Sequence, residues 1–194
     1  MDDVAIGGGA GAQMGKTAAE SADHSGPLET RIVSKNWNVR AQAYDDLNKL
    51  SVDATIDSKE GFFQTHVDQF KVYLKDTNPG ALEKCLDCLV NFLNKIQAKV
   101  LLDAQNGIIQ IIIEKMLLTH AKPGIKAKSL ESLLLLFEVT QNFDDSEDTL
   151  QTLLKHKNVK VLSNAVLALA QLVENYGVKK IKIANYAEVM LKNA

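Results

Sequence analysis

The stretch Cys85-Leu86-Asp87-Cys88-Leu89-Val90-Asn91-Phe92-Leu93 carries an apolar pattern that two later stretches of the chain repeat. It begins on a small residue, and apolar residues follow at steps of one, three and four. The same positions hold Ser129, Leu130, Leu133 and Phe137, and then Ala165, Val166, Leu169 and Val173. Steps of three and four return to one face of an α-helix, so each stretch predicts a helix that buries one stripe.

Each of these helices follows a short polar turn, and a similar turn lies upstream of them. The four turns are Asn36-Trp37-Asn38-Val39-Arg40, Asp76-Thr77-Asn78-Pro79-Gly80, Ala121-Lys122-Pro123-Gly124 and Lys157-Asn158-Val159-Lys160. With Arg40, Gly80, Gly124 and Lys160 as markers, the turns are 40, 44 and 36 residues apart. Such spacings are typical of HEAT-type repeats, in which two antiparallel helices form one unit.

Apolar stripes also mark the helices that precede the turns. They are Phe63, Val67, Phe70 and Leu74, and then Ile108, Ile109, Ile112, Ile113, Met116 and Leu117. Asp144-Asp145-Ser146 would begin another helix with acidic residues at its positive end. Val178–Asn193 would be the first helix of a fifth pair. The sequence therefore predicts an all-α solenoid of HEAT-type helical hairpins, about four and a half repeats long and truncated at its C-terminus.

The first 27 residues differ in composition from the remainder of the chain. They contain the run Gly7-Gly8-Gly9-Ala10-Gly11-Ala12 and are mostly small and polar beyond Ile6. This predicts a disordered Gly/Ala-rich leader over residues 1–27 and an incomplete HEAT-repeat domain over residues 28–194. The leader carries a net charge of −3 within a total of −2, which leaves the domain close to neutral.

Composition also bears on partners and compartment. A net charge of −2 indicates no nucleic-acid partner. The longest apolar runs, such as Leu133–Phe137, are too short to cross a bilayer, so no membrane partner is expected. Cys85 and Cys88 lie three residues apart in a helical stretch and no secretory signal precedes the domain, which favours a reducing, cytoplasmic location.

Two motifs could carry chemistry. Ala10-Gly11-Ala12-Gln13-Met14-Gly15-Lys16-Thr17 fits a relaxed phosphate loop, but no buried strand precedes it and no apolar helix follows. Cys85 and Cys88 have a CxxC spacing without a second pair, so a core role is favoured over zinc binding. We therefore expect no enzyme, metal, cofactor or small-molecule substrate, and a nucleotide-dependent enzyme using Lys16 is the alternative of another class.

The turns are the more informative feature, because a solenoid places them along one edge. Their polar residues are Lys35, Trp37, Arg40, Lys75, Thr77, Asn78, Lys84, His120, Lys122, Lys126, Lys128, Lys155, His156, Lys157, Asn158 and Lys160. A basic ridge with one indole suits an acidic protein surface, since lysines steer the encounter and a desolvated indole supplies affinity. Alternatively, the lysines only solubilise the turns and Trp37 packs at the end of the solenoid.

The turns are also where the chain resembles a known family. Trp37-Asn38-Val39-Arg40, followed by Ala43-Tyr44-Asp45-Asp46-Leu47, resembles the opening of TOG domains in microtubule polymerases. Lys126-Ala127-Lys128 is similar to their third turn, and Asp76-Thr77-Asn78 fits the second. Lys157-Asn158-Val159-Lys160-Val161 is similar to the fourth, with Val159 in place of the usual proline. The resemblance runs from Leu28 to the C-terminus.

The resemblance implies that the turn edge binds curved αβ-tubulin. Matched position by position, the tubulin-binding residues would be Trp37, Arg40, Thr77, Asn78, Lys122, Lys126, Lys157, Asn158 and Lys160. TOG domains of this family have six repeats, so the chain would be an incomplete TOG domain. Because its repeats begin close to Met1, it would be the first TOG domain of a longer parent protein. The parent would add tubulin at microtubule plus ends, in the cytoplasm at microtubules, the spindle or the centrosome. A generic HEAT-repeat scaffold or adaptor for another protein is the alternative.

Overall fold

The structure, a computed structural model, describes residues 24–53, 60–117 and 120–192, and within these ranges it contains helices and no strand. The helices are α2 (Leu28–Arg31), α3 (Trp37–Val52), α4 (Glu60–Val67), α5 (Phe70–Tyr73), α6 (Pro79–Leu93), α7 (Ala98–Lys115), α8 (Pro123–Thr140), α9 (Glu147–Leu154), α10 (Val159–Tyr176), α11 (Val178–Ile181) and α12 (Ala184–Lys192). The predicted all-α class is confirmed.

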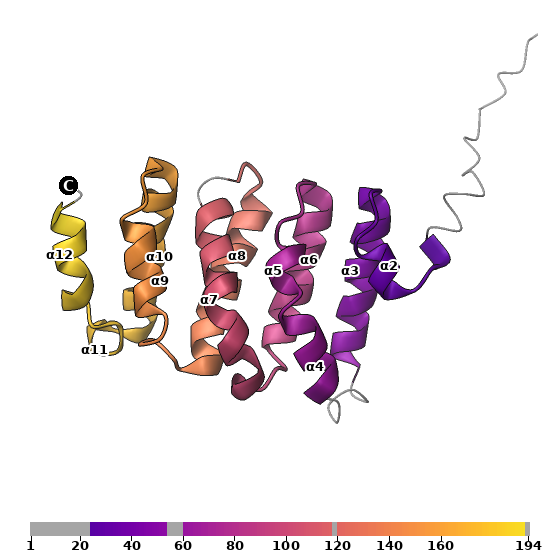
Figure 1. Cartoon of the computed structure of the whole chain (residues 1–194), viewed down its shortest axis with the longest axis horizontal. Helices are drawn as coiled ribbons and strands as arrows, with labels where there is room; N and C mark the ends of the chain where they lie inside the picture. The colour runs from indigo at the N-terminus through magenta and orange to yellow at the C-terminus, as the bar shows by residue number, and fades with distance from the viewer. Residues whose placement is uncertain (1–23, 54–59, 118–119, 193–194) are drawn as a thin grey trace, which may run out of the picture.

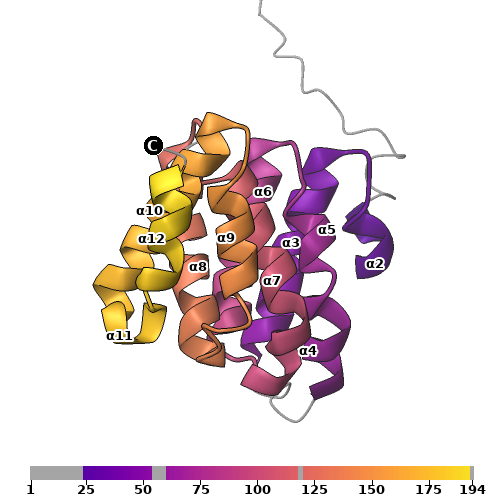
Figure 2. The same ribbon diagram turned by 60° about the vertical axis from the view of Figure 1, so that its left-hand side comes forward.

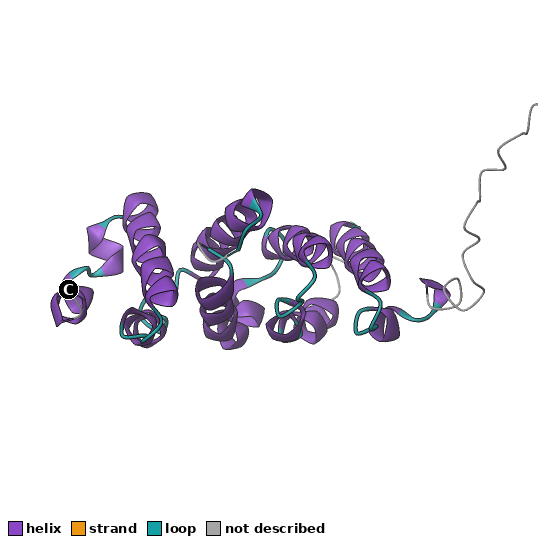
Figure 3. Cartoon of the chain, turned by 90° about the horizontal axis from the view of Figure 1, so that it is seen from above, coloured by secondary structure: helices purple, strands orange, loops and turns teal. Residues whose placement is uncertain are grey.

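The helices form a stack of antiparallel pairs in two layers (Figures 1 and 3). The second helices of the pairs, α3, α6, α8 and α10, lie in one layer. The first helices, including α7 and α9, lie in the other (Figure 3). Most contacts join neighbouring pairs, which is the arrangement of an α-solenoid. The predicted solenoid of helical hairpins is confirmed.

The core follows the predicted stripes except at one position, where Leu86 is buried but Leu130 is only partly buried and Val166 is 38% exposed. The small position that opens each stripe, Cys85, Ser129 and Ala165, is fully buried in all three helices. Leu89, Leu133 and Leu169 are buried one turn later. Both cysteines are free, and burial raises the pKa of each thiol, so they are protonated groups of the core.

Ion pairs join successive second helices through the first three pairs. Lys84 of α6 contacts Asp45 of α3 at 3.1 Å, and Lys128 of α8 contacts Asp87 of α6. Each lysine lies six residues after the N-cap of its helix. Each acid lies nine residues after the N-cap of the preceding helix. The same pairing is therefore built twice along the stack.

The stacking changes at the fourth pair, because α10 packs mainly on α7 and α9 and makes little contact with α8. The residue of α10 that corresponds to Lys84 and Lys128 is Asn164, six residues after the N-cap Asn158. Its side chain is fully buried and donates a hydrogen bond of 2.6 Å to the backbone oxygen of Ile113 in α7. A buried polar bond to a first helix thus replaces the ion pair between second helices.

The C-terminal end departs from the sequence expectation (Figure 2). A single helix over Val178–Asn193 was predicted, but α11 ends at Ile181 and α12 begins at Ala184. Between them Lys182 has a left-handed backbone with φ of 47°, which an α-helix cannot continue through. Its ammonium contacts the Asp144 carboxylate at 2.7 Å, which holds the break against the α8–α9 connection.

Residues 24–27, which precede the expected boundary at residue 28, contact the first helical pair. The Nε of Arg31 donates to the backbone oxygen of Gly26 at 2.8 Å, and the ring of His24 contacts the side-chain oxygen of Gln42 in α3 at 2.6 Å. Residues 24–27 are therefore joined to the first pair. Residues 1–23, which include the phosphate-loop-like stretch, lie outside the described residues.

Within the described ranges, no helix has both the length and the apolar character that crossing a bilayer requires. The same ranges contain no group of three or more His, Cys, Asp or Glu side chains placed to hold a metal ion.

We expect Asn164→Ala to lower the free energy of unfolding by about 2 kcal/mol, because it leaves the buried Ile113 carbonyl without this donor. Asn175→Ala is the matched control, since Asn175 is exposed on the same helix and donates only to Gln171. That control should lose less than about 0.5 kcal/mol. Urea unfolding at neutral pH measures both, and equal losses would contradict the role given to Asn164.

Candidate functional site

All four turns within the helical pairs lie along one edge of the stack, the upper edge in Figure 1. Helices α3, α6, α8 and α10 all begin at this edge and run away from it. The described connections between pairs, from α6 to α7, from α8 to α9 and from α10 to α11, lie at the opposite edge. The sequence-predicted residues of the turns are therefore brought to a common edge, as expected for a solenoid.

One hydrogen bond recurs in every turn. The backbone N–H of the N-cap residue donates to the side chain two residues before it. The pairs are Asn36 to Ser34 at 3.2 Å, Asn78 to Asp76 at 2.9 Å, Lys122 to His120 at 3.2 Å and Asn158 to His156 at 3.0 Å. In the two histidines the acceptor is Nδ1, so the ring proton of the neutral form is on Nε2. The four helices thus start from turns of the same local geometry.

Three of the N-caps are asparagines whose side-chain oxygens close the first helical turn. Asn36 accepts from the backbone of Asn38 at 3.0 Å, and Asn158 from Lys160 at 3.0 Å. Asn78 accepts from Gly80 at 2.8 Å and from Ala81 at 3.2 Å. Asn78 and Asn158 were predicted as partner contacts, and the structure gives their oxygens this capping role.

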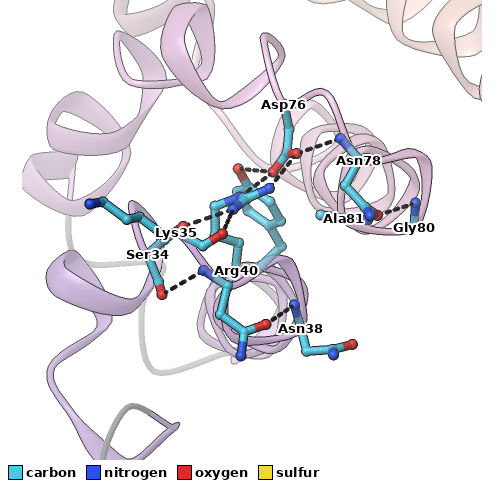
Figure 4. Close-up of polar contacts among 10 residues, drawn as sticks. Ser34, Lys35, Asn38, Arg40, Asp76, Asn78, Gly80 and Ala81 are labelled. Atoms are coloured by element: carbon cyan, nitrogen blue, oxygen red, sulfur yellow. Dashed lines mark hydrogen bonds and ion pairs between the residues drawn. The ribbon is translucent and has the colours of Figure 1, made fainter. Parts of the chain in front are cut away.

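Arg40 joins the first turn to the second (Figure 4). Its Nε and Nη2 donate to the two carboxylate oxygens of Asp76 at 2.6 and 2.8 Å. Its Nη1 donates to the backbone oxygens of Ser34 and Lys35 at 2.7 and 3.1 Å. The side chains of Arg40 and Asp76 are only 17% and 2% exposed. Such a two-pronged, shielded pair fixes the distance between the two turns.

The electrostatics of this pair favour the charged forms. Burial alone would raise the pKa of Asp76, but hydrogen bonds from Arg40 and from the Asn78 N–H outweigh it and hold that pKa below its usual value. The bond to Asp76 raises the pKa of Arg40. The hydroxyl of Tyr44 donates to Asp76 at 3.4 Å, and burial is the main cause that raises the pKa of Tyr44.

Trp37 lies on the same edge and is 43% exposed. A Cβ placed on Gly80 would lie 3.1 Å from the Cζ3 of Trp37, so the indole lies directly against the start of α6. A larger residue at position 80 would require the ring to shift by a few tenths of an ångström. The indole is therefore supported on one side by the second turn and open on the other, and Thr77 is exposed in that second turn.

The lysines of the later turns fall into two groups. Lys122 contacts the carboxylate of Glu83 in α6 at 3.3 Å. Lys126, Lys157 and Lys160 have no ion pair within the described ranges, and Lys157 and Lys160 are exposed. The fourth turn is thus where charge is most available to a partner.

Sequence reasoning missed the residues that position this edge. Asp76 appeared only as part of a turn motif, and its partner Arg40 is 36 residues away along the chain. Gly80 served as a spacing marker, and its close approach to the Trp37 ring was not foreseen. The position of Asp76 two residues before an asparagine N-cap was a usable signal for a side-chain turn bond.

A stack of antiparallel helical pairs with polar turns along one edge places this chain in the class of HEAT-type α-solenoid proteins. The sequence profile of the XMAP215/Dis1/CLASP TOG domain matches residues 23–194. The chain belongs to this TOG-domain family.

Relatives named for the spindle pole body, the centrosome or spindles match most of the chain. Spindle pole body component alp14 of Schizosaccharomyces pombe is 33% identical over 80% of this chain and 19% of its own length. Centrosomal protein 224 of Dictyostelium discoideum is 30% identical over 82% of this chain and 8% of its own length. Protein mini spindles of Drosophila melanogaster is 26% identical over 81% and 7%. The chain thus spans at most about a fifth of these proteins.

A solved structure of microtubule polymerases with tumor overexpressed gene (TOG) domain arrays, concerned with tubulin recruitment and assembly, has the same fold. The TM-score is 0.62 at 22% identity, over 82% of this chain and 34% of that one.

We expect Arg40→Met to lower the free energy of unfolding by about 3 kcal/mol, because it leaves the shielded Asp76 carboxylate without its counter-charge. The double change Arg40→Met with Asp76→Asn should lose less, since no charge is then buried. Lys49→Met is the control, because Lys49 is 77% exposed in its pair with Asp46 and should contribute less than about 0.5 kcal/mol. Chemical unfolding measures all three, and a double variant less stable than Arg40→Met would contradict the assignment.

The lowered pKa of Asp76 also predicts that the stability of the fold depends on pH. The ionised carboxylate stabilises the fold above the pKa of the unfolded chain, and this stabilisation is lost as pH falls through the lower folded pKa. Asp76→Asn should therefore be less stable than the parent at pH 7, with a smaller decrease between about pH 5 and pH 2. Asp103→Asn, at an exposed position, should retain the parent's pH profile. Parallel profiles for the Asp76 variant and the parent would oppose this role.

Proposed function

We propose that the turn edge binds αβ-tubulin as one TOG domain of a larger microtubule-regulating protein. The observation that supports this most strongly is the half-exposed Trp37, held against Gly80 on an edge that ends in the free lysines Lys157 and Lys160. Membership of the TOG family and the subject of the related solved structure point to tubulin as the partner.

The contacts of these residues indicate a different contribution to binding for each of them. Trp37 supplies affinity, because desolvating a fixed indole gains apolar burial at little cost in side-chain entropy. Lys126, Lys157 and Lys160 steer an acidic surface towards the edge. Thr77 adds an exposed side chain in the second turn.

Other predicted site residues act through the shape of the edge. Asn78 and Asn158 hold the helix starts, and Arg40 holds the first two turns together. Lys122 must share its charge between Glu83 and the partner. These residues would contribute to binding chiefly by keeping the edge in its bound geometry, which lowers the cost of ordering.

The role of the whole protein is proposed from its relatives. Because the names of alp14 and centrosomal protein 224 place them at the spindle pole body and the centrosome, we expect the parent protein at microtubule organising centres. There it would act as a microtubule polymerase that gathers tubulin through several TOG domains. Linked domains raise the local concentration of a shared partner without new contacts. The proposed role requires no bond chemistry.

We expect Trp37→Ala to weaken binding of this chain to unpolymerised αβ-tubulin at least about tenfold, as loss of a central aromatic anchor does. Val178→Ala is the matched control, because Val178 is 57% exposed at the opposite edge. Fluorescence titration at low salt measures both affinities. The proposal would be refuted if the folded, unsubstituted 194-residue chain does not bind tubulin. It would also be refuted if the Trp37→Ala variant binds as tightly as the unsubstituted chain.

A further inference from the structure

A hollow of about 350 Å³ lies between the first two turns of the turn edge. It is bordered by Val33 and Ser34 before α3 and by Val72, Lys75 and Thr77 before α6. Neither valine was predicted as a contact residue, and Lys75 was predicted only as part of the basic ridge of the turns. The hollow is continuous with the Arg40–Asp76 pair, which lines it as well.

The hollow is open to solvent, and part of its lining is apolar. Val33 is 65% exposed and Val72 is 56% exposed, and they come from neighbouring helical pairs. Two exposed β-branched side chains across one hollow present stiff apolar surface with few rotamers to lose. This arrangement favours an apolar side chain of a partner between them.

The polar lining of the hollow offers hydrogen-bond donors. A guanidinium has five N–H groups, and Arg40 uses four of them on Asp76, Ser34 and Lys35. The fifth, on Nη2, has no partner within the described residues, and both Asp76 oxygens already accept hydrogen bonds. The Lys75 ammonium and the Thr77 hydroxyl also have no partner there. The free polar groups thus suit a carboxylate or a backbone carbonyl.

We propose that this hollow is a binding subsite for a surface segment of the tubulin partner that presents an apolar side chain next to a carboxylate. The inference rests on the proposed function, because the hollow lies on the same edge as Trp37. The valines receive the apolar side chain, and Lys75 with the free Arg40 N–H receives the carboxylate. The same partner is assigned to the indole and to the hollow because both lie on the turn edge.

The lining is formed before the partner arrives. The two-pronged Arg40–Asp76 contact and the Tyr44 hydroxyl fix the polar side, so binding there requires little rearrangement. A partner group that meets fixed donors gains affinity because the cost of ordering them has been met during folding. The subsite therefore makes binding depend on the amino-acid sequence of the partner's surface segment, in addition to the lysine charges that steer the encounter.

The test is the affinity of the 194-residue chain for unpolymerised αβ-tubulin, measured for changes inside and outside the hollow. The double change Val33→Ser with Val72→Ser should weaken binding about tenfold, and Lys75→Ala about threefold with a smaller effect as salt increases. The matched controls are Val178→Ser and Lys179→Ala, which alter exposed residues of α11 at the opposite edge. These controls should bind as the parent does, and all variants should keep its melting temperature.

The outcomes separate this inference from the proposed function. If Trp37→Ala weakens binding while the valine and Lys75 variants bind as the parent does, the subsite is refuted and the proposed function stands. If the controls weaken binding as much as the hollow variants, the subsite is also refuted. If the folded, unsubstituted 194-residue chain does not bind tubulin at all, both proposals are wrong.

Discussion

The edge of this solenoid depends on one recurrent hydrogen bond, from the backbone N–H of each N-cap residue to the side chain two residues before it. Serine, aspartate and histidine all serve as the acceptor, at Ser34, Asp76, His120 and His156. The bond sets the direction in which the chain enters each second helix, and the helix start would otherwise leave that N–H to water. Because the four turns share this geometry, their outward side chains stand in one row and can meet a single partner surface.

Sequence patterns were sufficient for the features that depend on local periodicity. The small buried positions Cys85, Ser129 and Ala165 follow from helical steps, and the turn edge follows from repeat spacing. Features that depend on distant partners were not predictable in this way. Arg40 was expected to face the partner, because nothing in the local pattern indicates that Asp76, 36 residues later, occupies most of its donors. The break at Lys182 was missed for the same reason, since its contact is with Asp144 in another pair.

The distribution of charge along the edge has a structural origin that composition conceals. Lys84, Lys122 and Lys128 each contact an acid on the preceding second helix, so the charge of these three lysines is paired within the stack. The series ends where α10 moves away from α8, and Asn164 occupies the position of the next lysine. Lys157 and Lys160 therefore keep their charge free. A chain with a net charge of −2 can thus present unpaired, exposed lysines at the fourth turn of this edge.

The change of stacking at α10 also has a mechanical consequence. Helices α3, α6 and α8 pack directly against one another. This packing resists displacement of one helix along the next, because close-packed side chains tolerate little movement. Between the third and fourth pairs the load passes instead through α7, with the Asn164–Ile113 bond as a central fixed point. The compliance of the solenoid is therefore concentrated at this joint. A partner that alters its own curvature while held at both ends of the edge would bend the molecule there and leave the first three turns in their mutual positions.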